Sequence, residues 1–341
     1  MTPAPPEISV AVVNWNRRDY LRACLESLTR QRDARFEVIV VDNGSRDGSA
    51  EMAREEFGAR VIANAENRGF CAANNQAFAA ARGAFIALLN NDAEAEPDFL
   101  AALRRAFDAP EVGMAAAKVL VYEDPRRIDK AGHLIYPDGQ NRGRGTGEID
   151  QGQYDRDRDC LWPDGCAAMY RKAMLDRIGG FDEDFFMFAD DAELGLRARI
   201  AGWRCRYAPE AVVRHHRGGS LDAGSPRRIF LIERNRVLLA AKLFPWRLLL
   251  LNPFYFALRL AGGVAAAARG KGEMARFPGF PNKLRLASAI VRADLAALLL
   301  LPRMLRKRAA VRRMARLTPA QVRRLILDHR ISVRALVEKS N

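Results

Sequence analysis

The first 122 residues alternate between apolar stretches of strand character and amphipathic stretches of helical spacing. Apolar and β-branched runs that end in Asn, Asp or Gly indicate strands, whereas apolar residues three or four positions apart indicate helices. The expected strands cover 8–16, 36–45, 59–70, 84–92 and 112–122, and the expected helices cover 18–31, 47–58, 71–83 and 97–109. Such alternation predicts an α/β fold with a mostly parallel sheet covered on both faces.

Polar residues follow four successive strands of this expected sheet. These residues are Asn14 and Asn16, then Asp42, Asn43 and Ser45, then Asn67 and Gly69, and finally Asn90, Asn91 and Asp92. One polar strand end is ordinary turn chemistry, because Asn, Asp and Gly favour turns. Four in succession are better explained by a ligand site, because ligands of open α/β sheets bind outside the carboxyl ends of the strands.

Asp92 is the leading candidate for a metal ligand. Hard divalent cations such as Mg²⁺ take oxygen ligands, commonly one or two carboxylates together with substrate phosphates. His215 and His216 make up half of the four histidines, and an imidazole would complete a mixed carboxylate–imidazole site. The alternatives are a solvated carboxylate at a strand end and two histidines without a ligand role.

Asp190 and Asp191 open an expected helix within 185–203, directly after an aromatic segment. Carboxylates are favoured electrostatically at a helix N-terminus, which is the structural explanation. In a partly buried setting, however, the pKa of a carboxyl group rises toward the operating pH, and such a group serves as a general base.

The remaining segments of the first 224 residues are less regular. Residues 124–165 are rich in Gly, Asp and Arg and are expected to form a long excursion that acts as a flap. Residues 168–181 predict a strand and then a helix, and 205–220 predict a turn at Pro209 followed by a short strand. No GxxxxGK[ST] loop is present and no GxGxxG motif follows a strand, which argues against P-loop and dinucleotide-dependent enzymes.

The net charge of +14 is distributed unevenly. Residues 225–341 contain 25 Lys/Arg and five Asp/Glu, whereas 1–224 contain 30 and 36. We therefore expect a first domain at 1–224 and a basic helical region at 225–341. Its mixture of apolar bursts and arginines is typical of amphipathic helices on an anionic membrane surface. A helical accessory domain with a solvated basic face is the alternative.

Three further features bear on location and partners. The five cysteines are odd in number and lack CxxC spacing, which fits a reducing cytosol. The N-terminus has no signal-peptide pattern, and the longest apolar run, 248–258, is interrupted by Asn252 and Pro253, so we expect peripheral attachment rather than a spanning helix. Nucleic acid is not an expected partner, because the most basic part, 303–341, has few aromatic residues and no recognised motif.

Six motifs in order carry a family resemblance. VVNWN, VVDNGSRDGS, NRGFCAANN, LLNND, GGFDEDFFMFADDAELGLR and VVRHHRGGS together resemble the inverting family 2 glycosyltransferases with the GT-A fold, and especially the bacterial rhamnosyltransferase-like branch. The resemblance covers roughly 8–245. Each motif alone is weak, but the six in this order are specific.

The resemblance implies a role for each matched residue. Asp42 matches the residue that meets the nucleotide base, and the rest of the nucleotide-sugar pocket comprises Asn14, Asn16, Asn43, Ser45, Asn67, Gly69, Asn75 and Asn91. Asp92 matches the last carboxylate of the metal-binding DxD motif, and His215 matches the metal-ligating histidine. Asp190 and Asp191 match the Glu-Asp pair whose second member is the catalytic base. Gly165 and Arg197 are expected on the acceptor side.

The expected reaction is transfer of a sugar, with rhamnose as a candidate, from a nucleotide-diphosphate sugar to a hydroxyl of a lipid-linked or polysaccharide acceptor. Mn²⁺ or Mg²⁺ is the implied cofactor, and the cytoplasmic face of the plasma membrane is the implied location. The chain departs from the family at Asn90, which replaces the first carboxylate of the DxD motif. A catalytically weak scaffold module in a membrane glycan assembly therefore stays open as a second interpretation.

Overall fold

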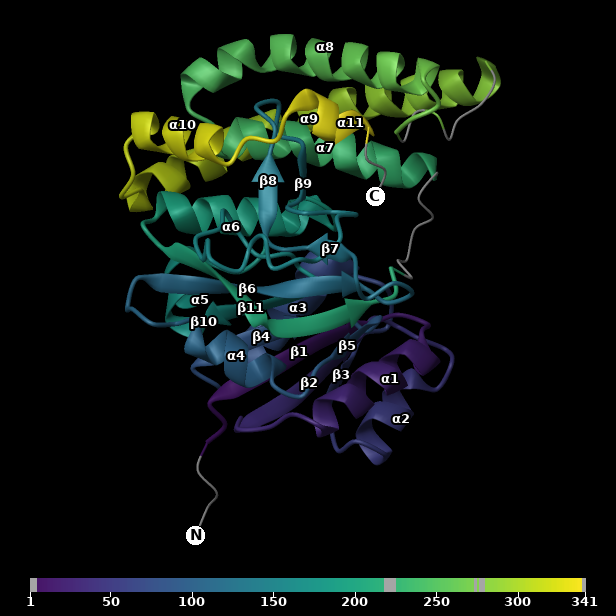
Figure 1. Ribbon diagram of the computed structural model, residues 1–341, viewed down its shortest axis with the longest axis vertical. Coiled ribbons are helices and arrows are strands. Elements are labelled where there is room, and N and C mark those ends of the chain that lie inside the picture. The colour runs from purple at the N-terminus through teal and green to yellow at the C-terminus, as the bar shows by residue number, and fades with distance from the viewer. Residues whose placement is uncertain (1–4, 218–224, 273–274, 276–279, 339–341) are drawn as a thin grey trace. The chain divides into compact units, whose positions relative to one another are not determined.

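The computed structural model describes residues 5–217, 225–272, 275 and 280–338, which fall into two compact units (Figure 1). Unit 1 is formed from Met1–His133, Gly143–Arg199 and Trp203–Gly219, and unit 2 from Leu134–Arg142, Ile200–Gly202 and Ser220–Asn341. The expected domain boundary between 224 and 225 adjoins 218–224, which lie outside the described residues, and it stays a prediction.

A nine-stranded sheet forms the centre of unit 1, in the order β3-β2-β1-β4-β10-β6-β11-β5, with β7 paired to β6. β3, β2, β1 and β4 run parallel, β10 is antiparallel to β4 and β6, and β11 is parallel to β6. The strands are β1 (Ile8–Asn14), β2 (Phe36–Asp42), β3 (Arg60–Ala63), β4 (Phe85–Leu89), β5 (Ala93–Ala95), β6 (Val112–Val121), β7 (Ile128–Lys130), β10 (Ala167–Arg171) and β11 (Arg204–His215). The expected α/β fold is confirmed.

Helices cover both faces of this sheet, because successive strand residues point to opposite sides. The helices of unit 1 are α1 (Arg18–Thr29), α2 (Ser49–Glu55), α3 (Gly69–Ala80), α4 (Phe99–Arg105), α5 (Lys172–Ile178), η1 (Glu183–Phe185) and α6 (Asp190–Ile200). The main core cluster joins apolar residues of α1, α2 and α4 to Phe85, Ala87 and Leu89 of β4.

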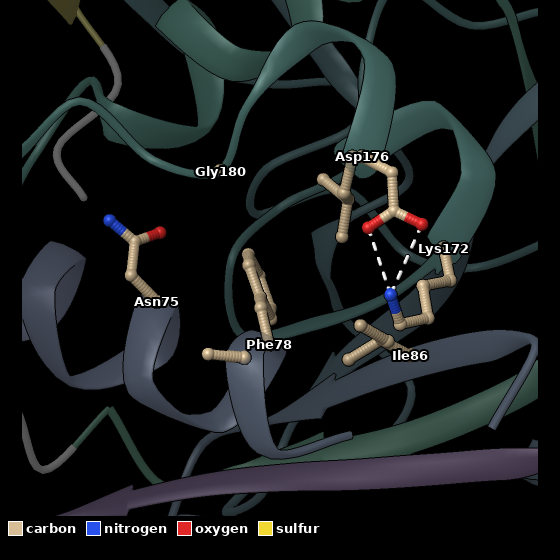
Figure 2. Close-up of a pocket in the computed structure, with 8 residues that line it drawn as sticks. Asn75, Phe78, Ile86, Lys172, Asp176 and Gly180 are labelled. Carbon is tan, nitrogen blue, oxygen red and sulfur yellow. Dashed lines mark hydrogen bonds and ion pairs between the residues drawn. The ribbon is translucent and has the colours of Figure 1, made fainter. Parts of the chain in front are cut away.

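The other face of β4 meets α3 and α5. Ile86, which alternates with the core residues of β4, lines a cavity of about 210 Å³ together with Phe78 of α3 and Leu175 of α5 (Figure 2). Lys172 and Asp176 form an ion pair beside it. α3 contacts β1 and β2 of the sheet, and α5 contacts β10.

Two expectations about irregular segments need correction. β11 continues through Pro209, because the chain absorbs the proline in a register irregularity between Ala208 and Val212 instead of turning there. The excursion 124–165 contains β7 and the strands β8 (His133–Ile135) and β9 (Asn141–Gly143), which pair with each other. The excursion therefore contains regular strands, which its weak sequence periodicity did not predict.

Unit 2 is mainly helical, as expected of the basic region. Its helices are α7 (Pro226–Leu243), α8 (Trp246–Ala268), α9 (Phe280–Met314), α10 (Pro319–Asp328) and α11 (Val333–Glu338). α8 runs without a break through Pro253, so the interruption of the apolar run at Asn252 and Pro253 does not interrupt the helix. By length and composition alone, α8 is the one helix in the described ranges that meets the criteria for a membrane span.

The interior of unit 2 contains paired charges. Glu233 of α7 is bonded by Arg236 and by Arg259 of α8, and Arg259 also reaches Asp138 at 2.6 Å. Asn252, beside Pro253, donates to the backbone oxygen of Asp138 at 2.9 Å. These bonds tie the short segment 134–142 to the helices of the same unit.

The packing of α6 can be tested at Gly195, whose missing side chain makes room for the buried Trp162. Gly195→Ala should lower the free energy of unfolding by about 1–3 kcal/mol, because overpacking outweighs the helix propensity gained. Urea unfolding measures this change. Gly165→Ala is the matched control, because its Cβ would meet Phe70 at an ordinary 3.4 Å. Equal unfolding midpoints for the two variants would contradict this account of the packing.

Candidate active site at the carboxyl ends of the strands

Asn14, at the end of β1, connects the ends of three neighbouring strands. Its Nδ2 donates to Asp42 Oδ2 and to Ser45 Oγ, both at 3.3 Å, and its Oδ1 accepts from Asn91 Nδ2 at 2.7 Å. The backbone N–H of Ser45 donates in turn to Asp42 Oδ1 at 2.8 Å. The structure thus brings together four residues that the sequence placed at separate strand ends.

A second set of amides continues this network toward α3. Asn43 Nδ2 lies 3.4 Å from Asn67 Oδ1 and 3.3 Å from the carbonyl of Gly69, and Asn67 Oδ1 accepts from Gly69 N. Asn16 joins at the rim, where its backbone N–H donates to Ser45 Oγ. The combined donors and acceptors suit ribose hydroxyls and phosphate oxygens, and they add little negative charge.

Asp92 and His215 lie side by side because β5 pairs antiparallel with β11, which places Ala93 opposite His215. His215 Nε2 is 3.3 Å from Asp92 Oδ1, and His215 Nδ1 is 2.7 Å from Asp129 Oδ2. Burial raises the pKa of Asp129, but Lys130, His215 and Arg217 lower it by a larger amount, so this pKa lies well below its usual range. An ionised Asp129 can only accept, so Nδ1 of His215 is the donor and Nε2 faces Asp92.

This pair of side chains fits a divalent cation. A carboxylate and an imidazole converge, and a second carboxylate fixes the imidazole from behind, as is common for metal-bound histidines. Burial lowers the pKa of His215, but Cys166 and the bonded Asp129 and Asp92 raise it by more, so the net shift is strongly upward. Glu94 does not join them, because its carboxylate bonds His216 Nε2 at 3.1 Å.

Asp190 and Asp191 begin α6 after an unusual turn. Phe186, Phe188 and Ala189 all have positive φ, a conformation that costs free energy in residues with side chains and that clusters at functional sites. Phe186 packs where a side chain on Gly69 would lie, and its carbonyl accepts from Cys71 N. The turn therefore sets the start of α6 against the start of α3.

Both aspartates are buried, and their surroundings separate them. Burial, and then the charge of Asp191, raise the pKa of Asp190 well above its usual value. Burial also raises the pKa of Asp191, but His133 and Lys130 oppose this effect. Asp191 is thus the more readily ionised member of the pair. Two carboxyl groups with separated pKa values are typical of acid–base sites.

Three consecutive residues, 164–166, connect these two parts of the site. Asp164 Oδ2 bonds His133 Nε2 at 2.8 Å, Gly165 N lies 3.4 Å from Asp191 Oδ2, and the carbonyl of Cys166 accepts from Asn90 N at 2.8 Å. Gly165, expected on the acceptor side, therefore lies beside the candidate base. Residues 164–166 therefore make the candidate base Asp191 a neighbour of the strand end that carries Asp92.

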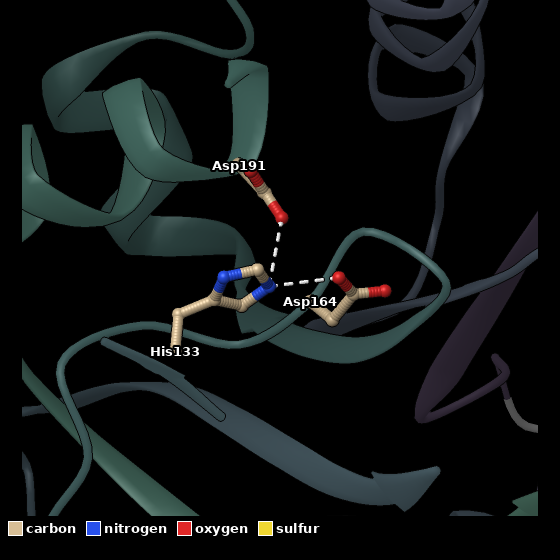
Figure 3. A group of neighbouring side chains, drawn as sticks. All are labelled: His133, Asp164 and Asp191. Carbon is tan, nitrogen blue, oxygen red and sulfur yellow. Dashed lines mark hydrogen bonds and ion pairs between the residues drawn. The ribbon is translucent and has the colours of Figure 1, made fainter. Parts of the chain in front are cut away.

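His133, Asp164 and Asp191 form a buried cluster that the sequence did not reveal (Figure 3). Lys130 Nζ lies 2.9 Å from Asp164 Oδ2 and adds a positive charge. Asp129, Lys130, His133 and Asp164 all come from the excursion 124–165, where no periodicity pointed to a site. The only available signal was their chemical type in a segment too long to be a simple connection.

Two of the expected site residues point elsewhere. The amide of Asn75 bonds the backbone N–H and carbonyl of Phe181, at 2.8 and 2.9 Å. The guanidinium of Arg197 is buried and bonds Glu193 and the carbonyls that end α5, including that of Gly180. Their donor-side and acceptor-side roles stay predictions. Residues 218–220 of the VVRHHRGGS motif lie outside the described residues.

Comparison with known proteins identifies the family to which this chain is similar. The family model "Glycosyl transferase family 2" matches residues 9–179. The N-acetylglucosaminyl-diphospho-decaprenol L-rhamnosyltransferase of Mycobacterium tuberculosis is 27% identical over 236 residues, which is 62% of this chain and 77% of the relative. The O-antigen biosynthesis protein RfbC of Myxococcus xanthus is 29% identical over 229 residues, which is 64% of this chain and 18% of that protein.

A solved structure has the same fold. The mannosyltransferase PcManGT from Pyrobaculum calidifontis, in complex with GDP-Man and Mn²⁺, superposes with a TM-score of 0.52 at 22% identity, over 92% of this chain and 86% of that chain. This likeness confirms the GT-A fold. Since the family model also spans half of the sequence, this chain belongs to glycosyl transferase family 2.

Proposed function

We propose that this glycosyltransferase inverts the anomeric centre while it transfers a sugar from a nucleotide-diphosphate donor to a hydroxyl of a lipid-linked or polysaccharide acceptor. The observation that carries the proposal is the turn 164–166, which makes the candidate base Asp191 a neighbour of the strand end that carries Asp92. Rhamnose is the donor sugar to test first, because a related chain is named a rhamnosyltransferase.

The donor would lie along the strand ends. Asp42 and the amides of Asn14 and Asn43 offer acceptors and donors for the base and ribose, and Asn67 and Gly69 continue this surface toward the sugar. Asn91 supports Asn14 by a bond of 2.7 Å. Because these groups already hold one another in place, binding the donor costs little reorganisation.

Asp92 and His215 would hold Mn²⁺ or Mg²⁺, with Asp129 as the group that orients His215. The cation supplies Lewis-acid stabilisation of the negative charge that develops on the leaving diphosphate. Asp191 would accept the proton of the acceptor hydroxyl on the face of the sugar opposite the leaving group. Gly165, which has no side chain, leaves space beside this carboxylate.

An exposed apolar surface on α8 would attach the enzyme to the membrane that carries a lipid-linked acceptor. Trp246, Leu250, Phe254 and Leu258 lie four residues apart along α8 and are 42–71% exposed; we call this surface the α8 apolar face. Apolar ridges of this kind, on a unit rich in arginine, suit insertion into the interface of an anionic membrane. Attachment to the cytoplasmic face of the plasma membrane would bring the enzyme to a polyprenyl-diphosphate-linked saccharide.

The base is tested by Asp191→Asn. We expect kcat for transfer to fall by about 10²–10⁴-fold, because general base catalysis is lost, while donor binding is retained. The assay is nucleoside diphosphate release from a panel of sugar nucleotides, with membrane extract as the acceptor source. Asp176→Asn, on the exposed surface of α5, is the control. Full transfer by Asp191→Asn would refute the mechanism, and no release by the wild type from any donor would favour the scaffold interpretation.

The metal site is tested by Asp129→Asn. Loss of the carboxylate behind His215 should raise the Mn²⁺ concentration needed for half-maximal activity by about 10–100-fold. Electron paramagnetic resonance of free Mn²⁺ measures the same affinity without turnover. Asp157→Asn, which alters a 72% exposed carboxylate of the same excursion, is the matched control. An unchanged Mn²⁺ affinity in folded Asp129→Asn would remove Asp129 and His215 from the proposed site.

Membrane attachment is tested by Leu250→Asp combined with Phe254→Asp. Each side chain contributes about 1.5–3 kcal/mol when buried, so partitioning onto anionic vesicles should fall at least about 100-fold. Vesicle sedimentation measures the partitioning. Ile149→Asp, an exposed apolar position in unit 1, is the control and should not change binding. Equal binding by the double variant would exclude the α8 apolar face as the contact.

A further inference from the structure

His133 is the least expected member of the site. It lies in the excursion 124–165, is only 5% exposed, and stacks on the buried Trp162 at a centroid distance of 5.9 Å. Its Nε2 faces two carboxylates, with Asp164 Oδ2 at 2.8 Å and Asp191 Oδ2 at 3.4 Å (Figure 3). A single nitrogen therefore links the candidate base to a second acid.

Asp164 is fixed in its ionised form. Burial raises its pKa, but Lys130 and His133 lower it by more, to well below the usual range. Its Oδ1 accepts from Cys166 N at 2.8 Å, and its Oδ2 is 2.9 Å from Lys130 Nζ. An ionised, multiply bonded carboxylate cannot donate to His133, so Nε2 of His133 must carry a proton.

The ring is held by few groups besides these carboxylates. Nδ1 of His133 is buried and has no hydrogen-bond partner within the described residues. Burial lowers the pKa of His133, but Asp191 and Asp164 raise it by more, so the net shift is upward. The charged groups that face the ring are Lys130, Asp164 and Asp191. These three groups have a net charge of about −1 when both carboxyl groups are ionised, and a protonated His133 would neutralise it.

The neighbouring Asp191 needs that charge. A buried carboxylate is stabilised in its neutral form, and a neutral carboxylic acid cannot act as a base. Burial is the main cause of its raised pKa, Asp164 adds to the rise, and His133 and Lys130 oppose it. A cation beside Asp191 therefore lowers its pKa and favours the ionised form that can act as a base.

We propose that His133 is a positioning residue whose protonated ring keeps the Asp191 carboxylate ionised and directed by its Nε2–H. The proposal rests on the proposed role of Asp191 as the base. His133 does not touch the reacting atoms. Its charge and hydrogen bond act through Asp191, and Asp164 and the stacked Trp162 hold the ring in place.

A divalent cation is the competing explanation, because the ligand atoms of His133, Asp164 and Asp191 lie within 4.8 Å of one another. The ammonium group of Lys130 argues against it. Lys130 already neutralises the Asp164 oxygen that a cation would use, and a second cation so close would be repelled. The histidine titration described below distinguishes these two explanations.

The test is the pH dependence of kcat in the wild type and in His133→Gln. Glutamine keeps an N–H donor but removes the charge. We expect the acid limb of the profile to move up by about one pH unit, so that kcat at a pH on that limb is about tenfold lower, with recovery at higher pH and an unchanged donor KM. His329→Gln is the matched control, because this histidine belongs to unit 2, where its Nδ1 bonds the carbonyl of Leu325 at 3.0 Å. An unmoved acid limb, or a loss of equal size at every pH, would overturn the proposal.

Asp164→Asn provides a second test, which also serves if His133→Gln does not fold. Removal of this negative charge should move the titration midpoint of His133 to lower pH, because Asp164 raises the pKa of His133; the histidine spectra described below measure this midpoint. No shift, or a shift to higher pH, would contradict the proposal. Thermal unfolding of each variant confirms that the compared proteins are folded.

A titration separates this inference from the proposed function. The chain has four histidines, so ¹⁵N-histidine spectra can follow His133 without any activity. We expect the His133 midpoint to lie above that of a free imidazole and to fall in Asp191→Asn. If no transfer is detected but the His133 midpoint falls in Asp191→Asn, the interaction between His133 and Asp191 is supported and only the role of Asp191 as the base is refuted. If Mg²⁺ shifts the His133 signal in preference to that of His215, the cluster is a metal site and the proposal is overturned.

Discussion

The burial of carboxylates is the constraint on which the site depends. Asp92, Asp129, Asp164 and Asp191 are all buried at the carboxyl ends of the strands. A charge removed from water is tolerated only when cations and hydrogen-bond donors replace the lost solvation. Each of these carboxylates accordingly has a partner: His215 lies between the first two, and His133 between the last two.

This arrangement divides the site into two similar halves. In each half an imidazole contacts a carboxylate with a strongly lowered pKa and faces a second carboxylate with its Nε2. We assign a cation to the first half and a proton to the second because the positive side chains differ in position. Lys130 stands 2.9 Å from Asp164 Oδ2, the oxygen that faces His133 Nε2, whereas Arg217 contacts Asp129, which bonds Nδ1 of His215 and not the Nε2 that faces Asp92.

In unit 2, charged side chains lie inside and an apolar surface is exposed, which is the reverse of the distribution in an ordinary soluble helical domain. Glu233, Arg236 and Asp138 are buried and Arg259 is largely so, and the four are bonded to one another, whereas the α8 apolar face is exposed. Buried ion pairs specify which helices meet, but they contribute little net stability. The exposed leucines, in contrast, gain free energy only when another apolar phase covers them. This distribution of polarity is the physical basis for expecting a membrane partner.

The sequence by itself determined the α/β order and the polar strand ends, because periodicity and turn chemistry are local and parallel strands end at one edge, and it proposed Asp92, Asp191 and His215 as candidate site residues. It missed Asp129, Lys130, His133 and Asp164, because their segment has no periodicity and their partners lie far along the chain. It also misjudged Pro209, where β11 continues through an irregular register instead of turning. Only the tertiary structure decided in which direction the pKa of each carboxyl group shifts, because a pKa depends on distances between charges that only folding brings together.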